Sequence, residues 1–377
     1  MSFIDKLHYW YPINKILGPK EFEISLASDS NHSFHHLILT GPNGSGKTTL
    51  LKELVKQVWE DLRHRKSQGG IIRLDWEPPR LSGQELPYRF KEGKFIAVYV
   101  EAMRNFQVQL PSGPQKLDLE PSPLGLKMSK HIVQFLVNKK SQQGFAMLEG
   151  QNEEVEKIKE WFNTLENNLR ELLALPEMSL EFDSTGFNFN ISHEDGRKYD
   201  FTSLADGHAS ALEIFSEILL RCDAMQKTEA TLPQDLEGII LIDELETHLH
   251  LELQEKILPF LTNMFPKLQF IVATHSPAVI ASVDNAVVFD LETKQARKSA
   301  EYRGVSYGAL MTGHFGISSD FDLYTTNQLQ KLNELYQKGE ARTKEEEHTF
   351  KTLAQELSKT SHPLALKVWN LLELGEV

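Results

Sequence analysis

The stretch Leu37–Leu51, LILTGPNGSGKTTLL, decides the fold. It begins with apolar residues typical of a buried strand, continues through a glycine-rich turn and ends in helix-forming residues. Gly41, Gly46, Lys47 and Thr48 match the spacing G-x-x-x-x-G-K-[ST] of a phosphate-binding loop. A strand before this motif and a helix after it are its required context. The stretch therefore predicts an α/β domain that binds the phosphates of a nucleotide.

Each residue type in this loop has a chemical reason. Glycines let the backbone curl, so that successive N–H groups point at phosphate oxygens. Lys47 can reach the β- and γ-phosphates as a mobile charge, and the following helix directs its positive end at them. The Thr48 hydroxyl can ligate magnesium, with Thr49 one residue further along. An ordinary glycine-rich turn has no need of a Lys–Thr pair, so we favour phosphate binding.

Composition and charge limit the class of protein. The 377 residues are 40% hydrophobic, which is enough for a large core and roughly two or three domains. The sequence has neither a run of about 20 apolar residues that could cross a bilayer nor an N-terminal secretion pattern. The single cysteine, Cys222, excludes an internal disulfide framework and is expected in the core of a cytoplasmic protein. The net charge of −13 argues against broad nucleic-acid binding by the chain itself.

A pair of acidic residues follows a second buried strand. In the segment EGIILIDELETHLH, the run Ile239–Ile242 is apolar throughout, as in a central parallel strand. Asp243 and Glu244 come next, and two adjacent carboxylates would be costly if they were simply buried. Beside a nucleotide, Asp243 can support magnesium and Glu244 can accept a proton from the attacking water. A further apolar strand, Gln269–Ala273, precedes His275, which can contact a γ-phosphate at the same edge of the sheet.

Several polar and aromatic residues have two interpretations. Trp10 and Tyr11 could stack on an adenine ring or be core or edge aromatics of a small antiparallel sheet. Glu101 and Gln107 follow a predicted strand and could orient a metal-bound water, or be solvated loop residues. Arg104, between them, could contact phosphate.

The histidine-rich segments predict loops rather than metal sites. We expect His32, His35 and His36 to lie in a polar loop without an acidic or cysteine partner nearby. His248 and His250 have no evident third ligand, and we expect them to shape the loop after the acidic pair.

The predicted architecture is an α/β P-loop fold with a mixed central sheet, antiparallel N-terminal strands, an inserted helical lobe and C-terminal helices. Four parts are expected: the first part of the head (1–106), the lobe (107–175), the second part of the head (176–318) and a helical extension (319–377). In the lobe, a proline-containing linker precedes helices at about 127–143 and 151–174, which Gly144 and Gly150 separate. The second helix is amphipathic and would pack most simply on the first.

Read in order, these segments resemble a known set of motifs. GPNGSGKTT resembles the Walker A motif, and IILIDE resembles Walker B with its catalytic acid. SLADGHASAL stands at the position of a signature loop, ETHLH resembles the loop after Walker B, and IVATHSP resembles the switch-histidine segment. The set is similar to ABC-type ATPases of the SMC/RecF/OLD-like group, above all to stand-alone bacterial ATPases that often occur in anti-phage defence operons. The resemblance runs from Ile38 to Asp290 and leaves out the lobe.

The resemblance implies a head-to-tail homodimer, or a higher oligomer, with ATP and Mg²⁺ between the Walker motifs of one subunit and the signature loop of the other. Carried over by position, the expected ATP-binding residues are Gly41, Pro42, Asn43, Gly44, Ser45, Gly46, Lys47, Thr48 and Thr49. Thr48 and Asp243 would hold Mg²⁺, and the implied catalytic residues are Lys47, Glu244 as general base and His275 as γ-phosphate sensor.

The signature segment departs from the common pattern of the group. Asp206, Gly207 and His208 would approach ATP across the dimer. Ala205 stands where a serine usually contacts phosphate, and Asp206 replaces a glycine, which bears on the strength of this contact and on the hydrolysis rate. Nothing after residue 290 resembles a Toprim-type nuclease, so we expect no DNA cleavage by this chain.

The predicted function is a nucleotide-switched ATPase that controls an effector protein encoded nearby, with nucleic acid contacted only indirectly and no membrane partner. One alternative is an ATP-binding scaffold that hydrolyses little and restrains a toxin-like partner. A second is a DNA-repair-type clamp that binds DNA directly, against which the acidic charge argues. An ABC transporter subunit is a third, for which the sequence outside the head gives no sign.

Overall fold

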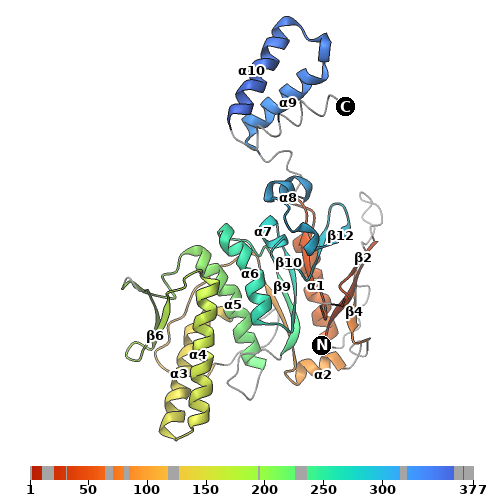
Figure 1. Cartoon of the computed structure of the whole chain (residues 1–377). Coiled ribbons are helices and arrows are strands. Elements are labelled where there is room, and N and C mark those ends of the chain that lie inside the picture. Colours follow the sequence, from red (N-terminus) through yellow and green to blue (C-terminus); the bar gives the residue numbers. More distant parts are fainter. Residues whose placement is uncertain are drawn as a thin grey trace. The chain divides into compact units, whose positions relative to one another are not determined.

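The computed structural model describes residues 2–10, 21–30, 32–63, 71–79, 85–117, 127–193, 196–225, 236–314, 321–360 and Val368. Two compact units make up the chain, which we call the head, Met1–Val305, and the C-terminal unit, Ser306–Val377 (Figure 1). The finer division of the head that the sequence predicts, around residues 107–175, stays a prediction.

A six-stranded sheet of order β12-β11-β3-β10-β9-β5 is the centre of the head. Its strands are β3 (His36–Thr40), β5 (Phe95–Val100), β9 (Glu237–Ile242), β10 (Leu268–Ala273), β11 (Ala286–Asp290) and β12 (Gln295–Lys298). All neighbours pair in parallel except β12, which is antiparallel to β11. The parallel strands are buried almost throughout, because helices and a second sheet cover their faces. The sequence does not predict β12, whose four residues are all exposed and carry no apolar alternation.

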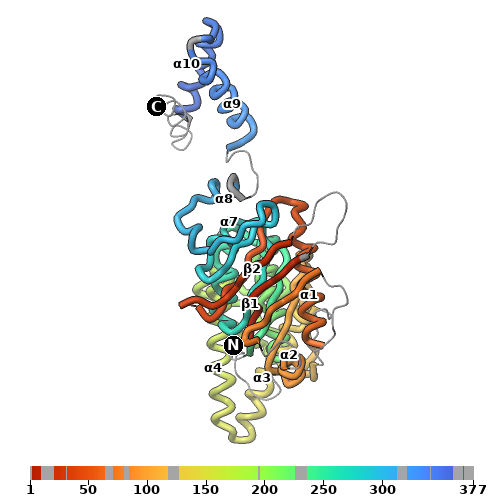
Figure 2. The backbone as a smooth tube through the Cα atoms, turned by 90° about the vertical axis from the view of Figure 1, so that its right-hand side faces the viewer, coloured from red at the N-terminus to blue at the C-terminus, as the bar shows by residue number. Residues whose placement is uncertain are grey.

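Two antiparallel sheets complete the strands of the head. The N-terminal sheet has the order β2-β1-β4, from β1 (Phe3–Trp10), β2 (Glu21–Ser25) and β4 (Ile72–Glu77), and Figure 2 shows β1 and β2 side by side. The other sheet contains β6 (Ser179–Asp183), β7 (Asn188–Ser192) and β8 (Lys198–Asp200). The buried Gln269 amide ties β10 to β1, since it accepts from the backbone of Ile4 at 2.8 Å and donates back to it at 3.0 Å. The predicted α/β P-loop fold with antiparallel N-terminal strands is confirmed.

Seven helices of the described head cover these sheets. They are α1 (Lys47–Leu62), α2 (Glu85–Lys91), α3 (Ile132–Leu148), α4 (Asn152–Leu172), α5 (Asp206–Met225), α6 (Leu251–Met264) and the single turn α7 (Pro277–Ile280). The sequence predicts only a connection where α2 lies. Helix α5 is buried on nearly every side, and Cys222 lies within it as a fully buried residue, as expected.

Helices α3 and α4 form an antiparallel hairpin (Figure 1). The rings of Phe135 and Trp161 meet at 5.6 Å between the two helices, so α4 packs on α3 as predicted. The prediction that Gly144 ends the first helix was wrong, because α3 continues to Leu148. A single glycine costs a helix only about 1 kcal/mol, which the packed turns around it offset. The reversal falls at Gly150, whose φ of 72° a glycine adopts without strain.

The C-terminal unit contains α8 (Tyr307–His314), α9 (Leu323–Gln337) and α10 (Lys344–Thr360). Leu332 and Leu335 of α9 pack with Leu353 and Leu357 of α10 and with Val368. The predicted C-terminal helices are present, and α9 and α10 are separated by residues 338–343. Three glutamates in the first turn of α10 favour a helix start there, because acidic side chains stabilise the positive end of a helix.

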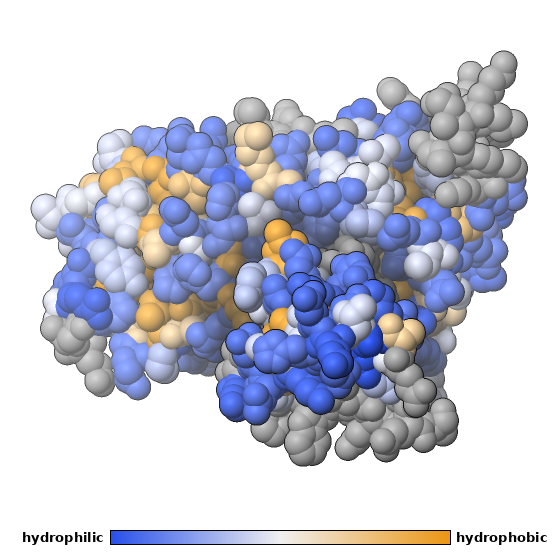
Figure 3. Space-filling model, turned by 90° about the horizontal axis from the view of Figure 1, so that it is seen from above, coloured by the Kyte–Doolittle hydropathy of each residue, from blue (hydrophilic) through white to orange (hydrophobic). Residues whose placement is uncertain are grey.

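The surface of the described residues is largely polar. Figure 3 shows hydrophilic residues over much of the face seen from above, with apolar residues in patches between them. Exposed apolar side chains also follow one another near the turn of the hairpin, at Phe145, Met147 and Leu148. Among all the residues that the structure describes, none of the helices has the length and apolar character that crossing a membrane requires.

Candidate nucleotide site

The phosphate-binding loop connects β3 to α1. Gly41 follows the strand with φ of 132°, and a Cβ atom there would lie 3.0 Å from the Ser45 hydroxyl oxygen. Gly46 caps the N-terminus of α1 with φ of 95°, in the left-handed region that favours glycine. The loop thereby curls tightly and turns the free N–H groups of α1 toward its own concave side.

Lys47 lies inside this loop with 6% of its surface exposed. Its Nζ donates to the carbonyl oxygens of Gly41 at 2.9 Å and Pro42 at 3.2 Å. Burial lowers the pKa of Lys47, and nearby carboxylates, led by Glu246 and Glu244, oppose that shift. A phosphate oxygen could replace either carbonyl as acceptor, because the ammonium group rotates freely among its partners.

Thr48 and Asp243 meet, although 195 residues separate them in sequence. The Thr48 hydroxyl donates to Asp243 Oδ1 at 3.1 Å. Burial raises the pKa of Asp243 and Glu244 raises it further, while the Thr48 hydrogen bond lowers it. A carboxylate with 2% exposure and an adjacent hydroxyl are hard oxygen donors, which Mg²⁺ prefers. The residues present therefore fit a magnesium ion.

Glu244 begins the turn that follows Asp243. Its backbone has φ of 45°, a conformation uncommon for a side chain with Cβ and frequent at functional sites. The carboxyl group is half-buried, and Thr247 Oγ1 donates to its Oε2 at 3.2 Å. The two acids that follow β9 therefore have different surroundings. Asp243 is buried and hydrogen-bonded to the phosphate loop, whereas Glu244 is partly open to solvent.

Glu246 is a site residue that the sequence analysis missed. Its Oε2 accepts from Thr274 Oγ1 at 2.7 Å, and its Oε1 accepts from the backbone N–H of His275. Glu246 thus joins the loop after β9 to the loop after β10. The available signal was a second acid two residues after Glu244, in the same ELE segment.

His275 follows β10 at the same edge of the sheet as the phosphate loop. Burial lowers the pKa of His275, and the positive charge of Lys47 lowers it further, against the opposing effect of Glu246 and Glu244. The ring is therefore neutral at neutral pH and has one donor and one acceptor nitrogen.

The predicted signature residues lie at the start of α5. Gly207 approaches the loop after β9 so closely that a Cβ atom would lie 3.2 Å from the His248 carbonyl oxygen and from His250 Cδ2. Burial lowers the pKa of His208, and His250 and His193 lower it further. Asp206 is exposed and lines a pocket of about 300 Å³. That pocket shares no lining residue with the pocket at the phosphate loop.

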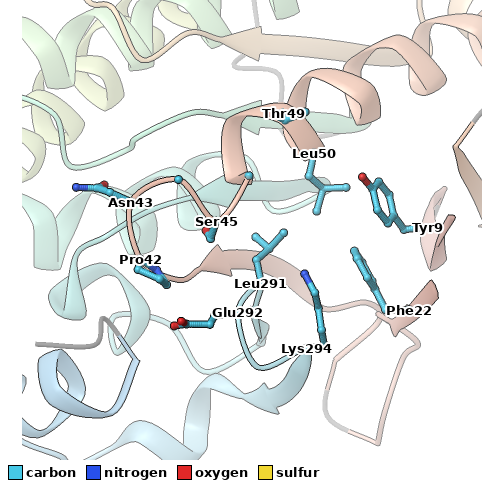
Figure 4. Close-up of a pocket in the computed structure, with 12 residues that line it drawn as sticks. Tyr9, Phe22, Pro42, Asn43, Ser45, Thr49, Leu50, Leu291, Glu292 and Lys294 are labelled. Carbon is cyan, nitrogen blue, oxygen red and sulfur yellow. The ribbon is translucent and has the colours of Figure 1, made fainter. Parts of the chain in front are cut away.

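An open pocket of about 520 Å³ lies beside the phosphate loop. Figure 4 shows the aromatic rings of Tyr9 and Phe22 on one side and Leu50, Leu291 and Lys294 facing them. The two rings stack at 4.8 Å, and Lys294 Nζ lies 5.3 Å from the Phe22 ring. The pocket also reaches Pro42, Asn43, Gly44, Ser45, Gly46 and Thr49 of the predicted binding set. It joins an apolar, aromatic wall to a phosphate-binding loop, which is the combination a nucleotide needs.

Parts of the chain are similar to known proteins. Residues 148–281 match a family described as AAA domain, putative AbiEii toxin, Type IV TA system. The Septu protein PtuA of Bacillus mycoides (strain KBAB4) is 32% identical over 139 residues, which cover 35% of this chain and 18% of that protein. The Retron Ec83 probable ATPase of Escherichia coli is 35% identical over 96 residues, covering 26% of this chain and 18% of that protein. Over these stretches the chain is similar to an AAA domain and to ATPase relatives.

The chain spans only about a fifth of the length of these two relatives. Among solved structures, the SMC head domain from Thermotoga maritima is 13% identical, with a TM-score of 0.38, over 76% of this chain and 94% of that one.

Arg104 does not lie where a phosphate contact would place it. Its Nη2 donates to the carbonyl oxygens of Asp243 and Glu244 at 2.9 and 2.8 Å, and its Nη1 to those of Leu245 and Thr247 at 3.1 Å each. With 7% exposure, the guanidinium group is committed to the turn that holds the acidic pair. Because that turn presents several carbonyl groups to one side, they accept from the guanidinium fork, and the Nη donors that a phosphate would need are already used. Glu101 and Gln107 are exposed, and their proposed role with water stays a prediction.

The expectation that the N-terminal histidines have no acidic partner was wrong. Asp29 approaches His32 Nδ1 at 3.3 Å and His35 Nε2 at 3.1 Å, because the connection between β2 and β3 folds back on itself. His36 is not a loop residue but begins β3, where its Nδ1 accepts from the Phe270 N–H at 3.0 Å. Burial lowers the pKa of His36 to about 3.

Other predicted residues remain without a test. The side chain of Trp10 and the whole of Tyr11 lie outside the described residues, and Tyr9 lines the pocket instead. His248 and His250 are exposed. The His248 carbonyl group and the His250 ring lie close to Gly207, which fits a role in shaping the loop. Among the described residues, the group with metal-ligand spacing is Asp29, His32 and His35. His248 and His250 are therefore not part of such a group.

Proposed function

We propose that this chain binds ATP with Mg²⁺ and hydrolyses it as an ABC-type head. The contact between Thr48 and Asp243 carries the proposal, because it joins the Walker A and Walker B segments at one point beside Lys47. Thr48 and Asp243 would hold magnesium, which when bound neutralises charge on the phosphates.

In this proposal the protein's own groups divide the remaining work. Lys47 exchanges its loop carbonyls for β- and γ-phosphate oxygens. Glu244 takes the proton of the attacking water, and its partly open position gives that water access. The neutral His275 ring hydrogen-bonds the γ-phosphate, and Glu246 holds the backbone N–H of His275 in place.

We propose a dimer in which the signature residues act across the interface. Asp206, Gly207 and His208 line or flank a pocket separate from the phosphate loop of the same chain, which supports their use by a second subunit. ATP between the subunits would favour the closed state and hydrolysis would release it. As the resemblance of the motifs implies, the closed state would control an effector protein in cytoplasmic anti-phage defence.

Lys47→Met tests the proposed activity. The variant should bind ATP about 10- to 100-fold more weakly, because hydrogen bonds to a charged group contribute about 1.5–3 kcal/mol each. Phosphate release from ATP and Mg²⁺ by the purified chain should fall with it. Lys56→Met is the matched control, since Lys56 lies on the same helix with its side chain 65% exposed. Equal activity in the wild type and Lys47→Met would contradict the assignment.

Phe22→Ala tests the base-binding side of the pocket. The dissociation constant for ATP should rise about 5- to 150-fold, because stacking on an aromatic ring contributes about 1–3 kcal/mol per base. Titration with a fluorescent ATP analogue measures it. Phe182→Ala, which removes a comparable ring from β6, should leave ATP binding unchanged. If both variants bind ATP equally well, the base lies elsewhere.

The altered signature supports a second candidate function, an ATP-binding scaffold that restrains a toxin-like partner with little hydrolysis. Ala205 lacks the hydroxyl group that contacts phosphate in the resembling family, and Asp206 adds a negative charge. Nucleotide binding without phosphate release, both alone and with a co-purified partner, would favour the scaffold.

A further inference from the structure

A cluster of metal-ligand type lies in the connection between β2 and β3, away from the nucleotide site. It consists of Asp29, His32 and His35, whose ligand atoms all lie within 4.8 Å of one another. The phosphate loop follows the carboxyl end of β3, whereas this cluster precedes the strand's first residue. We propose that Asp29, His32 and His35 bind one Zn²⁺ ion that fixes this connection to the sheet.

The tautomer of His35 is the first reason. Its Nδ1 lies 2.8 Å from the Ala27 carbonyl oxygen, which can only accept, so Nδ1 carries a hydrogen. In a neutral ring, Nε2 then carries a lone pair, and it lies 3.1 Å from Asp29 Oδ2. A lone pair and a carboxylate repel each other, so this contact requires either a second proton on the ring or a cation between the two atoms. A histidine that donates Nδ1–H to a backbone carbonyl and ligates through Nε2 is the usual arrangement at metal sites.

His32 supplies a second nitrogen. Its Nδ1 is buried and makes no hydrogen bond, and it faces Asp29 Oδ1 at 3.3 Å. Backbone hydrogen bonds hold the two residues together, from His32 N to Asp29 Oδ1 at 2.9 Å and from Asp29 N to the His32 carbonyl at 3.0 Å. The loop therefore keeps this nitrogen beside the carboxylate without a hydrogen bond between them.

The distances fit a tetrahedral ion. Ligands about 2.0–2.1 Å from a tetrahedral Zn²⁺ lie about 3.3 Å from one another. The nitrogen–oxygen separations are 3.3 Å from His32 Nδ1 to Asp29 Oδ1 and 3.1 Å from His35 Nε2 to Asp29 Oδ2, so each nitrogen lies at about this distance from one of the two carboxylate oxygens. Two imidazoles and one carboxylate favour Zn²⁺ over Mg²⁺ or Ca²⁺, which prefer oxygen ligands. A water molecule would supply the fourth ligand.

Lys298 competes for the same carboxylate. Its Nζ lies 3.0 Å from Asp29 Oδ2, and its side chain is 57% exposed and free to turn into solvent. An ion at the cluster would displace this ammonium group. The cluster would in turn hold the backbone of His35, whose carbonyl accepts from Gln269 Nε2 at 2.8 Å in the core of the sheet.

Zinc content tests the proposal on the full chain. After incubation with Zn²⁺ and dialysis, the wild type should retain about one zinc per chain by elemental analysis, and Co²⁺ should give the visible absorption of a tetrahedral site. The double variant Asp29→Asn, His35→Gln should lose at least 100-fold in Zn²⁺ affinity. His8→Gln is the matched control, because His8 also lies between two carboxylates, Asp75 at 2.9 Å and Glu23 at 3.3 Å. This control should retain its zinc.

A second variant guards against misfolding. Lys298→Met removes the competitor but no ligand, so its Zn²⁺ affinity should rise several-fold, and a decrease would count against the proposal. If the wild type retains no more zinc than the double variant, the proposed zinc site is wrong. The contact of His35 with Asp29 would then be an ion pair. Circular dichroism of each variant confirms that the comparison is between folded chains.

Discussion

Glu244→Gln should retain ATP binding and lower the turnover number by about 10²- to 10⁴-fold, the usual contribution of a general base. Glutamine has the size of glutamate but cannot take the proton of the attacking water. It can keep the hydrogen bond from Thr247 Oγ1, so the turn that begins at φ of 45° should be preserved. Single-turnover phosphate release measures the chemical step, and equilibrium titration with ATP measures binding.

The slow variant should also accumulate the closed form. If ATP joins two subunits, Glu244→Gln with ATP should elute as a dimer in size-exclusion chromatography with light scattering, whereas the nucleotide-free chain should not. Glu252→Gln, at an exposed residue paired with Lys256 on α6, is the control and should behave as wild type. Unchanged phosphate release in Glu244→Gln would remove Glu244 from the catalytic role.

Arg104→Met should lower both the free energy of unfolding and the turnover number. The variant leaves the carbonyl groups of Asp243 and Leu245 without their donor, whereas those of Glu244 and Thr247 keep the Thr247 N–H and the Ser210 hydroxyl. Each buried unsatisfied polar group costs about 1–3 kcal/mol. Relaxation and water entry reduce the sum, so we expect a loss on the order of 2–4 kcal/mol by urea unfolding. Burial lowers the pKa of Arg104 to about 10, so the group stays charged at neutral pH and the effect should not depend on pH there.

Arg104→Lys separates stability from positioning. Lysine keeps the charge but cannot reach four carbonyls with one fork, so the turn should move and carry Glu244 with it. We expect a smaller loss of stability than in Arg104→Met, a reduced turnover number and little change in ATP affinity. Arg73→Met, at a residue 69% exposed beside Asp75, is the control. A turnover number in Arg104→Lys equal to that of wild type would show that the guanidinium geometry does not position Glu244.

Much of the candidate site is local in sequence, and the sequence predicted it. The phosphate loop needs glycine at particular positions and a lysine and threonine at the start of a helix, which adjacent residues specify completely. Apolar runs predict β3, β9 and β10, because a strand buried on both faces consists almost entirely of hydrophobic residues. Parallel strands end at the same edge of a sheet, so the residues that follow them are expected to lie close to one another there. The contact of Thr48 with Asp243 is what this reasoning predicts.

Other features have no local signal. Strand β12 is exposed and lacks alternation, so only its pairing with β11 defines it. The place of Tyr9 beside the phosphate loop depends on how one sheet lies against another. Gly144 stays helical because neighbouring turns pack, although its local propensity favours an end.

The sequence by itself determined the P-loop class, the order of the motifs and the identity of the acidic pair, because each depends on residue types at short, fixed spacing. Only the tertiary structure decided the partners of long or polar side chains. Arg104 binds the turn rather than phosphate, Glu246 joins two loops, and Asp29 lies between two histidines. Each of these contacts depends on where a folded backbone places its carbonyl, amide or carboxyl groups, and spacing along the chain does not specify that.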